Sequence, residues 1–187
     1  MTEQAAPLRE KKILLGVSGG IAAYKAADLA SKLTGGGAAV QTILTAAARE
    51  LIGAKTFEAV TGGAVFTDLW SGPESFRIGH IQLAEWADAI VVAPATADVL
   101  AKTACGLCDD LLSTTLCACW EKPILLAPAM NTKMWTNPAT QANIRTLQER
   151  NLRLVGPATG RLACGSEGPG RMAEPADILA ALVELLS

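Results

Sequence analysis

Short apolar runs alternate with segments of helical spacing along most of the chain. The runs, which have the length and composition of buried strands, lie at 13–17, 40–44, 89–93, 124–127 and 152–155. The clearest helical segments lie at 21–33, 96–120, 138–150 and 175–186. Strands that are each followed by a helix are typical of a parallel sheet with helices on both faces. The pattern therefore predicts an α/β fold of three layers.

Glycine and proline mark the ends of three helical segments. The triplet Gly35-Gly36-Gly37 predicts the end of the first segment. Pro138 and Pro175 each open a segment, at a position where proline removes no helical hydrogen bond. The segment 98–120 shows helical spacing throughout, and we expect one continuous helix there.

The length and charge of the chain narrow the class of protein. The chain has 187 residues, of which 50% are hydrophobic, and this is enough to form the core of one domain. We therefore expect a single domain at 11–187, preceded by a disordered tail at 1–10. A formal net charge of −2, with both signs scattered, offers no basic stripe for nucleic acid. The chain shows no signal-peptide pattern and no apolar run of membrane length. We therefore expect a cytoplasmic protein that binds neither nucleic acid nor membranes.

Four of the five cysteines fall in one segment. Cys105 and Cys108 form a CxxC pair, and Cys117 and Cys119 follow, which allows a zinc or redox interpretation. A continuous helix over 98–120 would not bend these residues around a metal. We therefore expect four small, buried helix residues and no metal site.

The first apolar run leads into Gly16-Val17-Ser18-Gly19-Gly20-Ile21 and then into a helix. Backbone N–H groups, a hydroxyl and a helix N-terminus converge at such a turn, which favours a phosphate site. Small residues could also be needed there for steric reasons alone. The turn lacks the GxGxxG pattern, and Thr45-Ala46-Ala47 stands where NAD needs an acidic residue. A mononucleotide such as FMN therefore fits better than a dinucleotide.

Two apolar runs end in nearly the same way. Residues 91–97 read VVAPATA and residues 125–131 read LLAPAMN. Each proline ends the hydrogen bonding of a strand, and the small residues let a flat ring lie against the backbone. Asn131 would then be a polar contact in an apolar pocket at the edge of the sheet. The plainer alternatives are two ordinary strand exits, with Asn131 as the N-cap of a following helix.

His80 and Cys164 are the other candidates for chemistry. His80 is the only histidine, and it lies in a predicted loop before the run 89–93. Proton transfer near neutral pH would suit it, although a single histidine is more often structural. Cys164 lies in the glycine-rich segment 160–172, which predicts a mobile lid bearing a thiol or, alternatively, a plain surface loop.

Five motifs together resemble the family of homo-oligomeric flavin-containing cysteine decarboxylases. In chain order they are GVSGGIAAYK, GHIQLAEWAD, VVAPATADVLAK, PAMNTKMW and LACGSEGPGRM, and the resemblance runs from residue 12 nearly to the C-terminus. It implies a Rossmann-like or flavodoxin-like sheet, FMN at a subunit interface, and a homotrimer or homododecamer. The implied activity is decarboxylation of 4'-phosphopantothenoyl-L-cysteine to 4'-phosphopantetheine in coenzyme A biosynthesis, through a thioaldehyde and an enethiol.

The resemblance also implies roles for individual residues. His80 matches the catalytic base, Cys164 the proton donor on a flap, and Asn131 the ligand of the substrate carboxylate. Met134 would line the substrate pocket. The flavin site would comprise Ser18, Gly19, Gly20, Ile21, Thr45, Pro94, Ala95, Thr96, Ala97 and Ala129. Glu85 departs from the pattern, because relatives tend to carry a basic residue there.

Three other functions stay open. An oxidative peptidyl-cysteine decarboxylase would lack the flap cysteine, and a prenylated-flavin synthase would not need the motifs of Asn131 and Cys164. A regulatory flavoprotein that inhibits a protein phosphatase would not need His80 either. No synthetase domain, such as bacterial relatives often carry, follows Ser187. We therefore expect a stand-alone carboxy-lyase acting on a small molecule, or a fragment of a longer protein.

Overall fold

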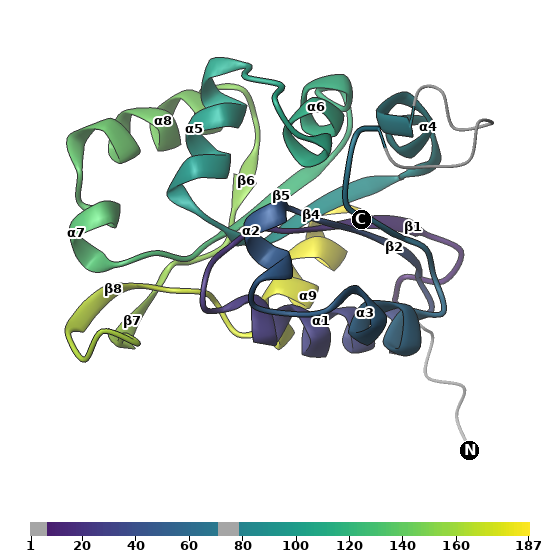
Figure 1. Cartoon of the computed structure of the whole chain (residues 1–187), viewed down its shortest axis with the longest axis horizontal. Helices are drawn as coiled ribbons and strands as arrows, with labels where there is room; N and C mark the ends of the chain where they lie inside the picture. Colours follow the sequence, from purple (N-terminus) through teal and green to yellow (C-terminus); the bar gives the residue numbers. More distant parts are fainter. Residues whose placement is uncertain (1–6, 71–78) are drawn as a thin grey trace.

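The computed structural model describes residues 7–70 and 79–187, which form a six-stranded parallel sheet with helices on both sides (Figure 1). The strands are β1 (Lys12–Val17), β2 (Ala39–Leu44), β3 (Val65–Phe66), β4 (Ala89–Ala95), β5 (Ile124–Pro128) and β6 (Arg153–Leu154). Their order is β3-β2-β1-β4-β5-β6, and every neighbouring pair is parallel. This Rossmann order confirms the predicted fold class. It also puts the switch in strand order, where such sheets bind ligands, between β1 and β4.

Two hydrophobic clusters, one on each face of the sheet, create the three layers. One face is covered by α1 (Ala23–Gly35), α3 (Ala54–Thr61) and α9 (Pro175–Leu185). The other is covered by α4 (Gly79–Trp86), α5 (Ala97–Cys105), α6 (Leu111–Ala118) and α8 (Pro138–Glu149). Every residue of β4 is buried, because this central strand has helices on both sides. Gly36 as the C-cap of α1, and proline at the start of α8 and α9, confirm three predicted helix ends.

Two short helices and a hairpin complete the described part of the chain. The helices are α2 (Ala46–Arg49) and α7 (Thr132–Trp135), and the antiparallel hairpin is β7 (Ala158–Arg161) with β8 (Glu167–Arg171). The hairpin occupies most of the segment that was predicted to be a loop, and its turn carries Cys164. None of the helices in the described residues is long and apolar enough to cross a membrane.

The segment 98–120 forms two helices, so the prediction of one continuous helix was wrong. Helix α5 ends at Gly106, which has a left-handed φ of 71° and donates its N–H to the carbonyl of Lys102. Helix α6 begins after Asp110, whose carboxylate accepts from the N–H of Ser113 at 2.8 Å. The Ser113 hydroxyl in turn accepts from the N–H of Asp110 at 3.2 Å. Gly106 as a C-cap and Asp110 with Ser113 as a capping box are the sequence signals for this break. The apolar positions keep their helical spacing across the break, so the spacing alone did not predict it.

The helix break also changes the surroundings of the four clustered cysteines. Only Cys119 is buried, at the C-cap of α6, and burial raises its pKa to about 11. Cys105, Cys108 and Cys117 are exposed, so the expectation of four buried thiols was wrong for these three. Within the described residues, no three His, Cys, Asp or Glu side chains are grouped in a way that could hold a metal ion.

Residues 7–10 belong to the folded domain, although the predicted tail included them. Leu8 is fully buried in the cluster that contains α1, and its N–H donates to the carbonyl of Gly36 at 2.9 Å. The rest of that predicted tail, residues 1–6, lies outside the described residues.

Candidate active site

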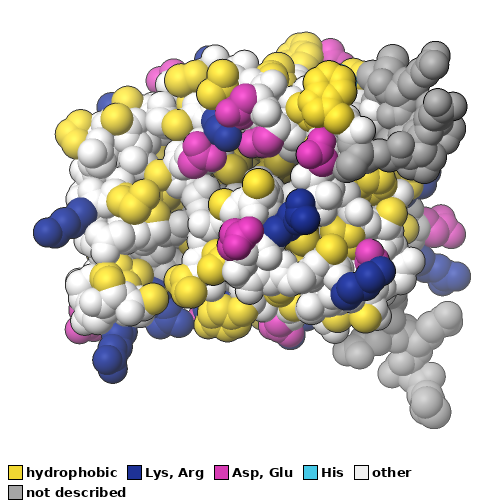
Figure 2. Space-filling model, in the orientation of Figure 1, with side chains coloured by type: hydrophobic (Ala, Val, Ile, Leu, Met, Phe, Trp, Pro, Cys, Tyr) yellow, Lys and Arg dark blue, Asp and Glu magenta, His cyan; other side chains and the backbone are white. Residues whose placement is uncertain are grey.

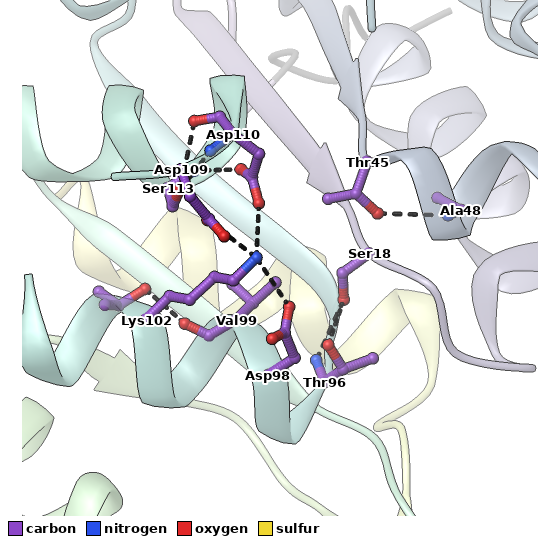
Figure 3. A network of polar contacts seen from close by, with 11 residues as sticks. Ser18, Thr45, Ala48, Thr96, Asp98, Val99, Lys102, Asp109, Asp110 and Ser113 are labelled. Atoms are coloured by element: carbon purple, nitrogen blue, oxygen red, sulfur yellow. Dashed lines mark hydrogen bonds and ion pairs between the residues drawn. The ribbon is translucent and has the colours of Figure 1, made fainter. Parts of the chain in front are cut away.

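The side chain of Ser18 joins the carboxyl ends of β1 and β4. Its hydroxyl donates to the carbonyl oxygen of Pro94 at 2.7 Å and accepts from the backbone N–H of Thr96 at 3.1 Å. The hydroxyl oxygen of Thr96 is also 3.1 Å away (Figure 3). Ser18 is only 1% exposed, so this link is part of the interior. Three predicted flavin-site residues are thus brought together at the switch in strand order.

The turn after Ser18 presents backbone N–H groups to an anion. Within the described residues, the N–H groups of Gly19, Ile21 and Ala22 have no hydrogen-bond acceptor. Helix α1 begins immediately afterwards, so its positive N-terminal end points to the same place. Unpaired N–H groups at a helix start are the usual phosphate-binding arrangement, and the turn fits that group.

Gly19 lies against the start of α2 with no room for a side chain. A Cβ at this position would overlap the Cβ of Ala47. Thr45 caps α2 by accepting the N–H of Ala48 at 3.2 Å (Figure 3). The predicted residues Gly19 and Thr45 therefore belong to adjoining segments, at the ends of the neighbouring strands β1 and β2.

The ends of β4 and β5, whose sequences match, lie side by side. Ala95 is the register partner of Pro128, and the N–H of Ala129 donates to the Ala95 carbonyl at 3.1 Å. The N–H of Met130 then donates to the carbonyl of Gly170 in β8 at 2.9 Å. A Cβ at Gly170 would overlap the carbonyl oxygen of Met130. Glycine is therefore needed for the hairpin to pack directly on the exit of β5.

Asn131 is both a helix cap and a contact of Cys164. Its Oδ1 accepts the N–H of Lys133 at 2.8 Å, which confirms the N-cap alternative for α7. Its Nδ2 donates to the Sγ of Cys164 at 3.1 Å. The two roles use opposite ends of one amide, so the cap fixes the direction in which the NH2 group points.

The thiol of Cys164 is exposed in the hairpin turn, 3.0 Å from the hydroxyl oxygen of Ser166. Hydrogen bonds from the Ser166 hydroxyl and backbone, with a further one from Asn131, lower the pKa of this thiol below its ordinary value. These bonds favour the thiolate, so Cys164 releases its proton more readily than a free cysteine. Such a thiol is suited to donating a proton.

A cavity of about 720 Å³ lies beside this thiol. Gly20 and Ile21 line it from the turn after β1, Ala129 and Asn131 from the exit of β5, and Cys164 from the hairpin. One cavity thus joins predicted residues of the flavin site, the substrate site and the catalytic group. Its volume is within the usual range for sites that bind small molecules and cofactors.

Of the predicted catalytic and substrate-binding residues, two do not line this cavity, and neither do Ser18, Gly19, Thr45 and residues 94–97 of the predicted flavin site. His80 lies in the first turn of α4, and not in a loop as predicted. Helix α4 is at the opposite end of the molecule from α7 and the hairpin (Figure 1). Met134, 49% exposed on α7, is also outside the cavity lining. A single chain therefore does not bring His80 to Asn131 and Cys164.

A charged cluster close to Ser18 and Thr96 was not foreseen from the sequence. The Nζ of Lys102 is 3.3 Å from Asp98, 3.0 Å from Asp109 and 3.0 Å from Asp110 (Figure 3). Burial alone would lower the pKa of Lys102, but hydrogen bonds with these carboxylates hold it above its usual value. The cluster ties α5 to the start of α6. The i, i+4 spacing of Asp98 and Lys102 was a signal for one of these pairs, whereas the other two depend on the helix break.

The family model described as Flavoprotein matches residues 1–187. The chain belongs to the Flavoprotein family. The turn after β1, with its unpaired backbone N–H groups, and the small residues at the exits of β4 and β5 agree with membership in this flavoprotein family.

Known proteins similar to this flavoprotein include one relative that is considerably longer. The Coenzyme A biosynthesis bifunctional protein CoaBC of Vibrio vulnificus is 51% identical over 173 residues, covering 92% of this chain and 43% of that protein. The chain thus spans less than half the length of this curated relative.

Two solved structures resemble the chain over almost their whole length. A PPC decarboxylase mutant complexed with pantothenoylaminoethenethiol has a TM-score of 0.86 at 36% identity, covering 95% of this chain and 98% of that one. The FMN binding protein AtHal3 has a TM-score of 0.80 at 37% identity, covering 93% of this chain and 95% of that one.

Proposed function

We propose that this flavoprotein decarboxylates 4'-phosphopantothenoyl-L-cysteine to 4'-phosphopantetheine in coenzyme A biosynthesis, and does so in the cytoplasm. The observation that carries the proposal is the 3.1 Å contact between the Asn131 amide nitrogen and the Cys164 thiol at the cavity. An amide that can hold a carboxylate lies beside a thiol that can supply a proton. That pair suits a reaction in which a carboxylate leaves and a proton is taken up. The similarity to CoaBC and to PPC decarboxylase supports the same reaction.

FMN is the cofactor that we propose, and the residues present fit it. The free N–H groups of Gly19, Ile21 and Ala22 would hold its phosphate, and the lack of room beside Gly19 would keep that turn in shape. Ser18, Thr45, residues 94–97 and Ala129 would complete the flavin site. FMN would supply a reversible two-electron oxidation of the carbon that bears sulfur, because a cysteine carboxylate has no electron sink of its own.

Each protein residue in this proposal has one task. His80 takes the proton of the substrate thiol. Asn131 holds the carboxylate through its Nδ2, while its Oδ1 stays fixed by the N–H of Lys133. The carboxylate can leave once the neighbouring carbon is a thioaldehyde, as it does from a β-keto acid. Cys164 then returns a proton to the resulting enethiol, and Met134 extends the wall of the substrate pocket.

A second copy of the chain completes the site in this proposal. Helix α4 carries His80 far from the hairpin, so the histidine beside Asn131 and Cys164 would come from a neighbouring copy. Ile21 and Tyr24, each 66% exposed near the cavity, and Ile81, 37% exposed beside His80, offer apolar side chains for such a contact. A contact between two different surfaces of one chain forms a closed ring when its rotation is a whole fraction of a turn, which is one third for a trimer. We propose a homotrimer, with a homododecamer of trimers as the larger assembly.

The test is to incubate the purified, flavin-loaded protein with 4'-phosphopantothenoyl-L-cysteine and to measure the product mass. We expect loss of CO2 alone. Loss of CO2 together with two hydrogens would favour the oxidative peptidyl-cysteine decarboxylase. Absence of turnover would contradict the decarboxylase and favour a regulatory flavoprotein.

A further inference from the structure

The cavity beside Cys164 is lined by three cationic side chains and by no acidic one among the described residues. Lys25 comes from α1, Arg161 from β7 and Arg171 from β8. Figure 2 shows Lys and Arg side chains projecting from the end of the molecule that holds α7 and the hairpin. The cavity therefore has a positive rim as well as the reactive thiol.

Two of these cations share a single carboxylate. The Oε1 of Glu174 is 2.7 Å from the Nζ of Lys25 and 3.1 Å from the Nη2 of Arg171. The hydrogen bond from Lys25 contributes most to lowering the pKa of Glu174, which keeps this carboxylate ionised near neutral pH. One negative charge thus stands against two positive charges, and the three side chains already hold one another in place.

Arg161 is different, because its guanidinium forms no ion pair or hydrogen bond within the described residues. It is the last residue of β7, three positions before Cys164, so the two Cα atoms are at most about 11 Å apart. A cation that lines a cavity with no protein partner is available for an anion on the ligand. The guanidinium fork matches a phosphate group in shape and in hydrogen-bond donors.

The proposed substrate carries two anionic groups at opposite ends. Asn131 accounts for the carboxylate next to the reacting sulfur, and nothing in the proposed mechanism accounts for the phosphate. We propose that Arg161 binds the terminal phosphate of the substrate and thereby makes the enzyme select phosphorylated over unphosphorylated substrates. This inference rests on the proposed decarboxylase function for the identity of the substrate. Lys25, Glu174 and Arg171 shape the rim, and Arg161 recognises the phosphate.

The kinetic test compares substrates with and without the 4'-phosphate. For Arg161→Ala, we expect KM for 4'-phosphopantothenoyl-L-cysteine to rise about 10-fold to 100-fold, with a much smaller change in kcat. KM for pantothenoyl-L-cysteine should change less than about 2-fold, because a contact with phosphate is not made there. Arg161→Lys should recover part of the loss. Equal losses on both substrates would overturn the proposal and place Arg161 on the carboxylate or in hairpin folding instead.

A matched control and a binding measurement separate this inference from the proposed function. Arg153→Ala removes an arginine of β6 that pairs with Glu184 at 3.5 Å outside the cavity, and should leave both KM values unchanged. Calorimetry with 4'-phosphopantothenate and pantothenate should show at least about 10-fold tighter binding of the phosphorylated compound, and Arg161→Ala should abolish this preference. Such a preference without turnover would refute the decarboxylase but keep the phosphate site. Turnover without a preference for the phosphorylated compound would refute the phosphate site but keep the decarboxylase.

Discussion

The amide nitrogen of Asn131 lies 3.1 Å from the sulfur of Cys164, while the oxygen of the same amide caps α7 at 2.8 Å. The two residues are 33 positions apart, and they meet because the hairpin packs on the exit of β5 through Met130 and Gly170. One side chain therefore fixes a helix end and faces the reactive thiol. This arrangement lets the two roles be separated by a single substitution.

Asn131→Asp should preserve the fold and abolish turnover. Aspartate caps a helix as well as asparagine, so we expect the melting temperature to change by only a few degrees. The new carboxylate would repel the carboxylate of the substrate and lacks the NH2 donor. Product mass and thermal melting measure the two effects. Asn137→Asp is the matched control, because Asn137 caps α8 in the same way, at 2.9 Å from the N–H of Ala139, and should retain activity.

Cys164→Ser should still decarboxylate the substrate but release an oxidised enethiol. The hydroxyl of serine is a far weaker acid than this thiol, so the final proton transfer would fail. The measurement is the product mass, which should fall short of the wild-type product by two hydrogens. Cys105→Ser replaces another exposed cysteine and should give the normal product. Fully reduced product from Cys164→Ser at wild-type yield would remove Cys164 from the mechanism.

The lowered pKa of Cys164 predicts a particular pH dependence. Because its folded-state pKa lies below that of a free cysteine, the thiol form is lost at lower pH, and the share of oxidised product should increase as pH rises. Alkylation by iodoacetamide should likewise reach half its maximal rate at a lower pH for Cys164 than for N-acetylcysteine. Ser166→Ala removes the hydrogen bond that contributes most to lowering the pKa of Cys164, and should shift the alkylation midpoint to higher pH. Peptide mass spectrometry measures the alkylation of Cys164 against pH in the wild type and in Ser166→Ala. The same midpoint in both proteins would contradict the role of Ser166.

Gly19→Ala should impair flavin binding more than folding. The added Cβ would overlap Ala47 at the start of α2, so the turn would have to move away from its phosphate-binding shape. We expect a loss of flavin affinity of about 10-fold or more, equivalent to about 1.4 kcal/mol. Gly35→Ala is the matched control, since no atom lies within 4 Å of a Cβ at that position. Flavin absorbance per chain and thermal melting test the prediction, and normal flavin content in Gly19→Ala would refute it.

Two inactive variants should restore activity together if neighbouring copies share the site. His80→Asn lacks the base and Asn131→Ala lacks the carboxylate ligand, so neither should turn over substrate alone. After co-expression at equal levels, one contact in four would carry both native residues, and about a quarter of wild-type activity should return. Different affinity tags on the two variants, with purification on one tag and then the other, would isolate and confirm mixed oligomers. Mixed oligomers without activity would show that one chain supplies both residues.

The sequence determined the layered α/β fold, because apolar runs of strand length alternate with helical segments whose apolar faces require burial against a sheet. It also located the glycine-rich turn after β1 and the matching exits of β4 and β5, because glycine, alanine and proline mark these strand ends. The continuous helix at 98–120 was wrong because helical spacing persists across Gly106 and Asp110, whose capping geometry ends one helix and begins the next. Cys105 and Cys108 lie at this break and are exposed.

The tertiary structure alone decided which distant residues meet. It placed Asn131 against Cys164, left Arg161 unpaired among the described residues at the cavity, and put His80 at the far end of the chain's fold. These relationships depend on how the hairpin and α4 pack, and periodicity along the chain carries no information about side-chain distances between remote segments. Sequence patterns specify which faces are buried, whereas the geometry of a site arises only when those faces are packed together.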